Sequence, residues 1–367
     1  MALFSKKIRY AVVGLGHISQ VAVLPAFAHA RKNSQVVALV SNDPRKLRAI
    51  SRKYNVKQTY SYAQYEDCLR NVDAVYIALP NSMHAEYSVR AANAGVHVLC
   101  EKPMAVTAAE CEGMIRAAKA AGVKLMVAYR LHFEKINLGA IELVRRGKIG
   151  EPKFFTSAFS MTARPGDIRT RKETGGGTLY DIGVYCINAA RYLFRAEPTE
   201  VMAFSVNAAR DRLPEIDEST ASILRFEGDR VASFITSFNA ADVSAYRIVG
   251  TKGDLRVEPA YEYAEGLAYE LTTNGRKTRK KSGKHDQFAA ELLYFSNCIQ
   301  KNREPEPSGE EGLQDVRIVQ ALYESAETGR PVHLPRYRPP QRPDARQEIQ
   351  RPPVDKPELV NVHSPSQ

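Results

Sequence analysis

The chain has few cysteines, no long apolar run and fewer acidic than basic residues, and each shortage excludes a class of proteins. Its five cysteines are scattered, with no CxxC pair and no neighbouring pair of histidines, so we expect neither a disulfide framework nor a metal site. No run approaches the roughly 20 apolar residues of a membrane span. The opening MALFSKKIRY leads directly into a strand-like segment and leaves no room for a signal peptide. We therefore expect a cytoplasmic protein with no membrane partner.

The basic excess raises the question of a polyanionic partner. The chain carries 52 Lys and Arg against 41 Asp and Glu, which gives a formal net charge of +11. Much of the excess lies in RKTRKKSGK (residues 276–284), which has no interleaved aromatic residues and matches no nucleic-acid motif. We interpret this stretch as a solvated loop. The charge balance then favours anionic small ligands and predicts no nucleic-acid partner.

The length of 367 residues predicts about two domains. Short apolar runs, separated by segments of helix length, recur at residues 8–14, 36–40, 74–79, 96–100 and 124–129. Such runs are typical of parallel strands that are covered on both faces. Thr107 and Glu110 form a capping box, Gly122 ends the same helix, and Ser82 is a second candidate cap. Residues 1–130 are therefore predicted to form a doubly wound α/β domain of the Rossmann type.

The pattern changes after residue 130. Alternating strands without helices between them are predicted at residues 152–160, 199–207, 219–227, 230–238 and 245–250. Two helices, 285–300 and 310–329, are expected to flank this sheet. Residues 131–336 are thus predicted to be an α+β domain with a mostly antiparallel sheet. The proline-rich residues 337–367 have too few apolar side chains to order themselves, and we interpret them as a flexible tail or an arm that becomes ordered on a neighbouring subunit.

A glycine-rich turn follows the first predicted strand. VVGLGHIS places Gly14 and Gly16 between a strand and a helical pattern, with Ser19 at the third position of the GxGxxG motif. Glycine allows the tight turn and lets the backbone approach a pyrophosphate, whose charge then faces a helix N-terminus. A GxG alone is often an ordinary turn. In this context it predicts a dinucleotide site.

The end of the second strand indicates which dinucleotide binds. An acidic residue normally accepts hydrogen bonds from the ribose of NAD at this position, but here the residue is Ser41, followed by Asp43, Arg45 and Lys46. A hydroxyl with nearby cations suits a 2′-phosphate, because Lys and Arg supply charge-assisted hydrogen bonds. We therefore predict NADP(H) as the cofactor. Asp43 pointing at a ribose, and the basic residues forming only a solvated helix face, are the alternatives.

Two further stretches contain candidate catalytic residues. CEKPMA places Lys102 at the carboxyl edge of the parallel sheet, where open α/β sheets bind ligands. GGGTLYDIGVYCINAARYL places Asp181 and Tyr185 four residues apart, on one helix face. From the residues alone, catalysis competes evenly with a plain helix cap at Asp181 and a core aromatic at Tyr185. Cys186 is interpreted as a buried apolar thiol.

Together, the GLG turn, LPNSMHAE, CEKPMA and the GGG-to-DIG stretch resemble the family of glucose-fructose oxidoreductases, inositol dehydrogenases and their relatives, over about residues 7–335. The motifs are most similar to those of glucose-fructose and aldose oxidoreductases, since many other relatives have histidine where this chain has Tyr185. The resemblance implies a Rossmann domain and a large sheet that forms a homodimer or homotetramer. It also implies Lys102 as catalytic lysine, Tyr185 as proton-transfer residue and Asp181 as a carboxylate that orients the substrate. The cofactor contacts it implies are Gly14, Gly16, His17, Ile18, Ser41, Lys46, Leu79, Pro80, Asn81, His84, Glu101, Lys102, Arg130 and Arg169.

The activity implied by the resemblance is hydride transfer at a sugar carbon. An ammonium group beside a phenol favours the phenolate and makes it a better base near neutral pH, and Lys102 is expected to act in this way on Tyr185. The main hypothesis is an NADP-dependent enzyme that oxidises an aldose at C1 to the lactone and passes the hydride to a second sugar, giving an alditol. A sugar dehydrogenase that releases NADPH each cycle and a catalytically silent sensor are the alternatives.

Overall fold

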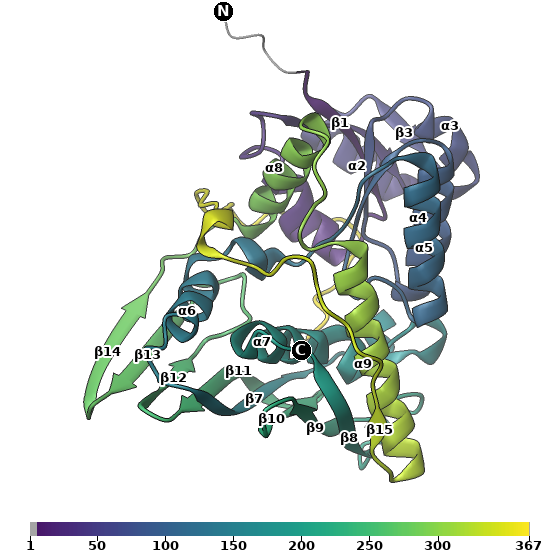
Figure 1. The fold of residues 1–367 in the computed structure, drawn as a ribbon. Coiled ribbons are helices and arrows are strands. Elements are labelled where there is room, and N and C mark those ends of the chain that lie inside the picture. Colours follow the sequence, from purple (N-terminus) through teal and green to yellow (C-terminus); the bar gives the residue numbers. More distant parts are fainter. Residues whose placement is uncertain (1–5, 367) are drawn as a thin grey trace, which may run out of the picture.

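The computed structural model describes residues 6–366, which form two sheets with helices packed against them (Figure 1). The first sheet has six parallel strands in the order β3-β2-β1-β4-β5-β6. Its strands are β1 (Ile8–Val13), β2 (Ser34–Val40), β3 (Gln58–Tyr60), β4 (Ala74–Ile77), β5 (His97–Cys100) and β6 (Leu125–Val127). This order confirms the doubly wound fold, with β3 as an additional short edge strand.

Helices cover both faces of this sheet because alternate strand residues point to opposite sides. Ala11 and Val13 face one core, and Tyr10 and Val12 face the other. The helices that pack here are α1 (Leu24–Ala26), α2 (Pro44–Tyr54), α3 (Tyr65–Leu69), α4 (His84–Asn93), α5 (Ala108–Ala121) and α8 (Gln287–Gln300). The capping box at Thr107 and the C-cap at Gly122 are confirmed.

Two predictions for these helices are wrong. Helix α8 was expected to flank the second sheet, but it packs on the first, where Ser296 hydrogen bonds to Tyr10 at 2.7 Å. Its apolar periodicity predicted a buried helix but carried no information about which sheet it covers. Ser82 does not cap α4, because it lies inside a short 3-10 turn whose last residue, Met83, precedes the helix.

The second sheet has nine strands in the order β14-β13-β12-β11-β7-β10-β9-β8-β15. All neighbours are antiparallel except β7 and β10, which run parallel. The strands are β7 (Pro152–Thr162), β8 (Pro198–Val206), β9 (Ser219–Phe226), β10 (Arg230–Ser237), β11 (Asn239–Gly250), β12 (Gly253–Val257), β13 (Ala268–Thr273), β14 (Arg276–Lys281) and β15 (Val332–His333). The prediction of a large, mostly antiparallel sheet is confirmed.

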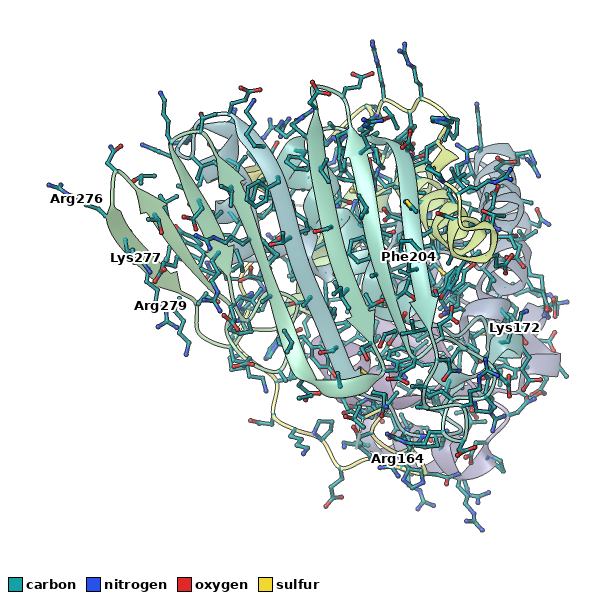
Figure 2. All side chains as sticks on the ribbon, turned by 90° about the horizontal axis from the view of Figure 1, so that it is seen from below. Arg164, Lys172, Phe204, Arg276, Lys277 and Arg279 are labelled. Atoms are coloured by element: carbon teal, nitrogen blue, oxygen red, sulfur yellow. The ribbon has the colours of Figure 1, made fainter. Side chains whose placement is uncertain are left out.

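One face of this sheet carries helices, and no helix of residues 6–366 covers the other, which we call the bare face. Helices α6 (Lys135–Arg145), α7 (Val184–Phe194) and α9 (Gly309–Thr328) share a core with its inner face. Figure 2 shows the opposite face with no helix over it. The basic stretch 276–284 was expected to be a loop, but its first part is the edge strand β14. All residues of the edge strand β14 are exposed to solvent. Its cationic side chains disfavour pairing of this edge with strands of other chains.

Short helical turns connect these elements and several of them border the site described below. They are η1 (Ser19–Val23), η2 (Tyr62–Gln64), η3 (Asn81–Met83), η4 (Arg130–Phe133), η5 (Ile168–Thr170), η6 (Lys172–Thr174), η7 (Leu179–Gly183) and η8 (Ala345–Gln347). The π-helical turns η1 and η7 follow the two glycine-rich stretches. Within residues 6–366, no helix has both the length and the apolar character to span a bilayer.

The proline-rich segment after β15 follows the surface of its own chain (Figure 1, yellow). Arg342 donates to Glu197 at 2.6 Å, and Gln347 donates to the Glu306 carbonyl at 2.8 Å. The sequence indicates a flexible tail or an arm that becomes ordered on a neighbouring subunit, and the structure places the segment against its own chain. The tail has few apolar side chains to bury. Hydrogen bonds from its Arg342 and Gln347 side chains hold it against the rest of the chain instead.

Candidate active site

A cavity of about 660 Å³ lies between the first sheet and the inner side of the second. It opens at the carboxyl ends of β4, β5 and β6, where the chain leaves the parallel sheet and where such sheets bind ligands. The first sheet contributes Gly16, Leu79, Lys102 and Arg130, and the region before α7 contributes Asp181 with Tyr185. The volume is within the range of small-molecule sites.

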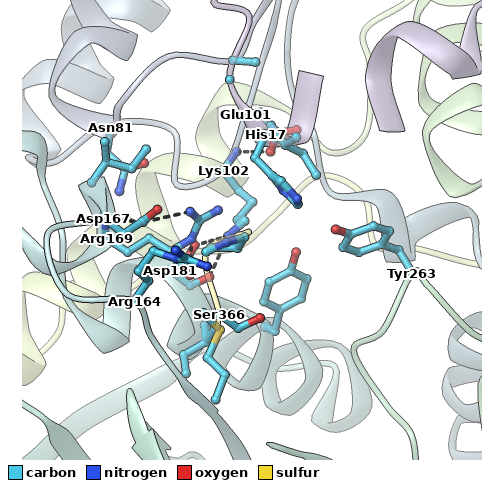
Figure 3. A pocket seen from close by; sticks show the side chains of 18 of the residues that line it. His17, Asn81, Glu101, Lys102, Arg164, Asp167, Arg169, Asp181, Tyr263 and Ser366 are labelled. Carbon is cyan, nitrogen blue, oxygen red and sulfur yellow. Dashed lines mark hydrogen bonds and ion pairs between the residues drawn. The ribbon is translucent and has the colours of Figure 1, made fainter. Parts of the chain in front are cut away.

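Lys102, Asp181 and Arg169 form one chain of charges in the cavity wall (Figure 3). The Lys102 ammonium donates to the Asp181 carbonyl at 2.6 Å and to its carboxylate at 2.9 Å. Arg169 Nε donates to the other carboxylate oxygen at 3.0 Å. Asp181 therefore binds two cations and caps no helix, so the alternative of a plain N-cap is wrong.

The charges of this group persist over a wide pH range. Burial alone would raise the pKa of Asp181, but the charges of Lys102 and Arg169 and the hydrogen bonds from them lower it to about 2. Burial alone would lower the pKa of Lys102, but the nearby Asp181 and Tyr185 raise it above its ordinary value. Asp181 is thus a carboxylate and Lys102 an ammonium at neutral pH.

Tyr185 lies between two cations. The Lys102 Nζ is 5.1 Å from the centre of the Tyr185 ring, and the Arg130 guanidinium carbon is 5.0 Å from it. Arg130 is itself held by the side chain of Gln287 at 2.5 Å and by the carbonyls of Tyr261 and Glu262. The amine from the sheet edge and the phenol from α7 thus converge on one cavity.

The glycine-rich turn fits a dinucleotide. Gly14 has a φ of +91°, and a Cβ there would lie 2.4 Å from the Ala78 carbonyl oxygen, so packing against the end of β4 requires glycine. A Cβ at Gly16 would meet no heavy atom within 4 Å, which leaves open space beside the backbone where the helical turns begin. A pyrophosphate can approach this backbone and face the helix N-terminus.

The end of β2 is arranged around Asp43. One carboxylate oxygen of Asp43 caps α2 by accepting from the backbone of Arg45 and Lys46, at 2.9 and 3.1 Å. The other oxygen accepts from Asn361 at 2.6 Å. Ser41 is buried and its hydroxyl accepts from the Asp43 backbone at 3.1 Å. Both Asp43 oxygens are therefore engaged within the protein.

The structure places most of the other predicted cofactor residues around the cavity. The predicted cofactor residues that line it are Gly16, His17, Ile18, Leu79, Asn81, His84, Glu101, Lys102, Arg130 and Arg169. The predicted residues that do not line it are Gly14, Ser41 and Pro80, in the turns after β1, β2 and β4, and Lys46, in the first turn of α2.

His84 and Glu101 have internal partners in the cavity wall. Both ring nitrogens of His84 face backbone carbonyls, of Pro103 at 2.8 Å and of Leu79 at 2.9 Å. Burial lowers the pKa of His84, and its contacts with the two carbonyls act in the opposite direction. Glu101 accepts from the Tyr76 hydroxyl at 2.8 Å. These two side chains therefore fix the turns that surround the cavity.

Several residues of the cavity were not predicted from the sequence. Arg164 and Asp167 come from the loop after β7, and Tyr263 comes from the segment after β12 (Figure 3). Asp167 accepts from Arg169 at 3.1 Å and so extends the chain of charges. None of these residues belongs to a motif. The tail residues in the cavity wall are Val362, His363, Pro365 and Ser366.

Two family models match the chain. A model described as an oxidoreductase family with an NAD-binding Rossmann fold matches residues 8–129. A second model, described as the C-terminal alpha/beta domain of an oxidoreductase family, matches residues 141–334. Together they cover both sheets and leave the tail outside.

Individual relatives match most of the chain. The crystal structure of an aldose-aldose oxidoreductase from Caulobacter crescentus, complexed with glycerol, is 37% identical, covers 90% of this chain and 100% of its own, and gives a TM-score of 0.85. The 3-ketoreductase KijD10 of Actinomadura kijaniata, in complex with NADP and TDP-benzene, is 26% identical over 87% of this chain and 98% of its own, with a TM-score of 0.80. A D-xylose 1-dehydrogenase (NADP(+)) of Haloarcula marismortui is 32% identical over 89% of this chain and 93% of its own length.

Proposed function

The chain belongs to the oxidoreductase family of glucose-fructose oxidoreductases, inositol dehydrogenases and their relatives, and on this premise we propose that it is an NADP-dependent oxidoreductase of sugars that oxidises an aldose at C1. The observation that carries the proposal is the convergence of Lys102, Asp181 and Tyr185 on a cavity that also borders the glycine-rich turn. When bound, NADP(H) accepts the hydride and returns it.

The side chains of the cavity supply the proton chemistry. Oxidation of a pyranose at C1 removes a hydride from the carbon and a proton from its hydroxyl, and the Tyr185 oxygen takes this proton. The ammonium of Lys102 and the guanidinium of Arg130 lie beside the Tyr185 ring and offset the negative charge that its oxygen carries before it takes the proton. Asp181, held by Lys102 and Arg169, presents a fixed acceptor that orients the sugar hydroxyls.

The reaction proposed in full passes the hydride to a second sugar. The first sugar leaves as a lactone, and the carbonyl of the second receives the hydride and a proton and becomes an alditol. The similarity to an aldose-aldose oxidoreductase supports this version, and the similarity to D-xylose 1-dehydrogenases supports the alternative in which NADPH is released each cycle. The test is the absorbance of purified, desalted protein: a nicotinamide band that an acceptor sugar bleaches favours the two-sugar reaction.

A silent sensor is the third candidate. It needs a sugar or nucleotide pocket but no pair of groups that transfers a proton. The cavity holds such a pair in Lys102 and Tyr185, which favours an enzyme. Absence of hydride transfer over a panel of aldoses and ketoses would reverse this preference.

Cofactor choice gives a separate prediction. Both oxygens of Asp43 are occupied, so no free carboxylate competes with a 2′-phosphate near Lys46. Replacing Lys46 by Ala is expected to weaken NADP binding roughly tenfold, because a charge-assisted hydrogen bond is lost, and to leave NAD binding unchanged. Fluorescence titration with each nucleotide measures both. The control is Arg52→Ala, at the exposed C-terminal end of the same helix. Tighter binding of NAD than of NADP by the wild type would contradict the assignment.

The bare face of the second sheet is proposed as the subunit interface of a homodimer or homotetramer. Large apolar side chains gather on this face, with Phe204 and Val206 on β8 each 58% exposed and Ile235 on β10 55% exposed. Figure 2 shows Phe204 in the open face. Further members of this apolar set are Phe154, Ile223, Val231 and Val243. Contiguous exposed apolar area of this kind marks interaction surfaces.

Charge placed in this face is expected to separate the subunits. Ile235→Asp would put a carboxylate into an apolar interface without a partner, so the variant should elute as a monomer in size-exclusion chromatography with light scattering. Its fold should persist, because the side chain is exposed within one chain. Arg279→Asp, on the exposed edge strand β14, is the matched control and should keep the wild-type mass. A wild-type chain that is already monomeric would refute the interface.

A further inference from the structure

Residues 358–366, which we call the strap, cross the cavity between the two halves of the molecule. They lie beyond residue 334, where the second family model ends. At one end they contact the helices that follow β1 and β2, and at the other they contact the end of β7. Between these anchors, Val362 and His363 line the cavity.

The first anchor of the strap lies at the carboxyl ends of β1 and β2, where folds of this type bind a dinucleotide. The Gln20 side chain makes two hydrogen bonds with the Val360 backbone, donating at 3.0 Å and accepting at 2.8 Å. Asn361 donates to Asp43 at 2.6 Å, and Val360 packs against the core beneath. Gln20 belongs to η1, just after the glycine-rich turn, and Asp43 caps α2. The strap thus joins the two helices whose N-termini surround the pyrophosphate and ribose positions.

The second anchor lies on the sugar side of the cavity. The Arg164 backbone donates to the Pro365 carbonyl at 2.9 Å, and its side chain donates to the Ser364 carbonyl at 3.2 Å. Ser366 pairs with Ala163 as a short β-bridge. Ser366, Arg164 and Asp181 all belong to the wall of the same cavity (Figure 3). The strap is therefore tied to both halves of the molecule, across the space between them.

We propose that the strap is part of the nucleotide site and retains NADP(H) in the cavity from one hydride transfer to the next. Its hydrogen bonds use the Gln20 side chain and the Asp43 carboxylate, while the space beside Gly16 stays open. A cavity of about 660 Å³ remains between the strap and Lys102, so the strap covers the site and leaves room in it. A nucleotide that leaves must wait for the strap to detach, which slows dissociation and leaves the hydride step unaffected. This inference rests on the proposed NADP-dependent function, and it favours the two-sugar reaction within it.

Release of NADPH tests the proposal without measuring catalysis. The proteins compared are the full chain, a variant that stops after residue 357, Asn361→Ala, and the control Glu348→Ala. Glu348 is an exposed tail residue whose side chain hydrogen bonds only to Gln350 within residues 6–366. Each is loaded with NADPH and chased with excess NADP, and the loss of NADPH fluorescence is followed by stopped flow. Thermal melting of each variant checks that it is folded.

The rate of NADPH release is expected to increase in steps from the wild type to the shortened chain. The shortened chain should release NADPH roughly tenfold faster or more, because several hydrogen bonds and an apolar contact are lost together. Asn361→Ala should lie between it and the wild type, and Glu348→Ala should match the wild type. Equal release rates for the full and shortened chains would overturn the proposal, and slower release by the shortened chain would show that the strap competes with the nucleotide. If no variant binds NADPH, the proposed function fails instead. Binding without hydride transfer to any sugar also contradicts that function, while the release rates still decide the role of the strap.

Discussion

Replacing Tyr185 by Phe is expected to lower kcat by roughly 10²-fold or more, within the range for lost general acid-base catalysis. The substitution removes one oxygen atom and keeps the ring, which packs between the Lys102 ammonium and the Arg130 guanidinium. The sugar and the nucleotide should still bind, so KM and NADPH affinity should change little. Steady-state rates with an aldose, together with a single-turnover measurement of the hydride step, separate these quantities.

The matched control for this prediction is on the same helix. Tyr192 lies on α7 and is buried, and its hydroxyl has no hydrogen-bond partner within the described residues 6–366. Tyr192→Phe deletes the same atom from the same residue type and is expected to keep wild-type turnover. Turnover by Tyr185→Phe at the level of Tyr192→Phe would remove Tyr185 from the proton transfer.

Replacing Lys102 by Met is expected to cause a loss of similar or larger size, roughly 10²- to 10⁴-fold in kcat. The variant keeps an unbranched side chain of similar length, but it removes the ammonium that binds Asp181 at 2.9 Å and lies 5.1 Å from the Tyr185 ring. Asp181 keeps Arg169 as its partner, at 3.0 Å, so the carboxylate is not left unpaired and the protein should remain folded. Thermal melting and hydride-transfer rates are measured on the same preparation.

Two comparisons make the Lys102 result specific. Lys119→Met, an exposed lysine on α5, should leave activity unchanged. The second comparison is the thermal melting of Lys102→Met beside the wild type, which separates a loss of proton transfer from a loss of folding. Wild-type turnover in this variant, or a loss explained by unfolding alone, would exclude Lys102 from catalysis.

Local patterns predicted the first sheet and its motifs well. Continuous apolar runs marked five of its six strands, and the capping residues at Thr107 and Gly122 mark the ends of α5 as expected. The glycine turn was recognisable because Gly14 has a positive φ and meets the end of β4 closely, constraints that act over a few residues. The short strand β3 was not predicted, because its sequence QTY contains no apolar run.

Long-range pairings were less predictable. The apolar pattern of helix α8 predicted a buried helix but not its position. The helix lies on the first sheet because its apolar side packs against Tyr10 and the neighbouring core residues. The basic residues of β14 were predicted to form a loop because they show no alternation of apolar and polar side chains. They form a strand because they pair with β13. No sequence motif marks the cavity residues Arg164, Asp167 and Tyr263, because only the folded chain brings their loops to the site.

The sequence by itself determined the fold class and the dinucleotide turn, because these depend on local backbone geometry and on motifs of a few residues. Its resemblance to a family supplied Lys102, Asp181 and Tyr185 as the predicted catalytic residues. Only the tertiary structure decided that Asp181 binds two cations, that Asp43 is fully engaged, and that the proline-rich tail returns to its own cavity. Each of these rests on atoms that come together across large separations in the chain. Such contacts depend on how whole sheets pack, and no spacing of residues along the sequence encodes them.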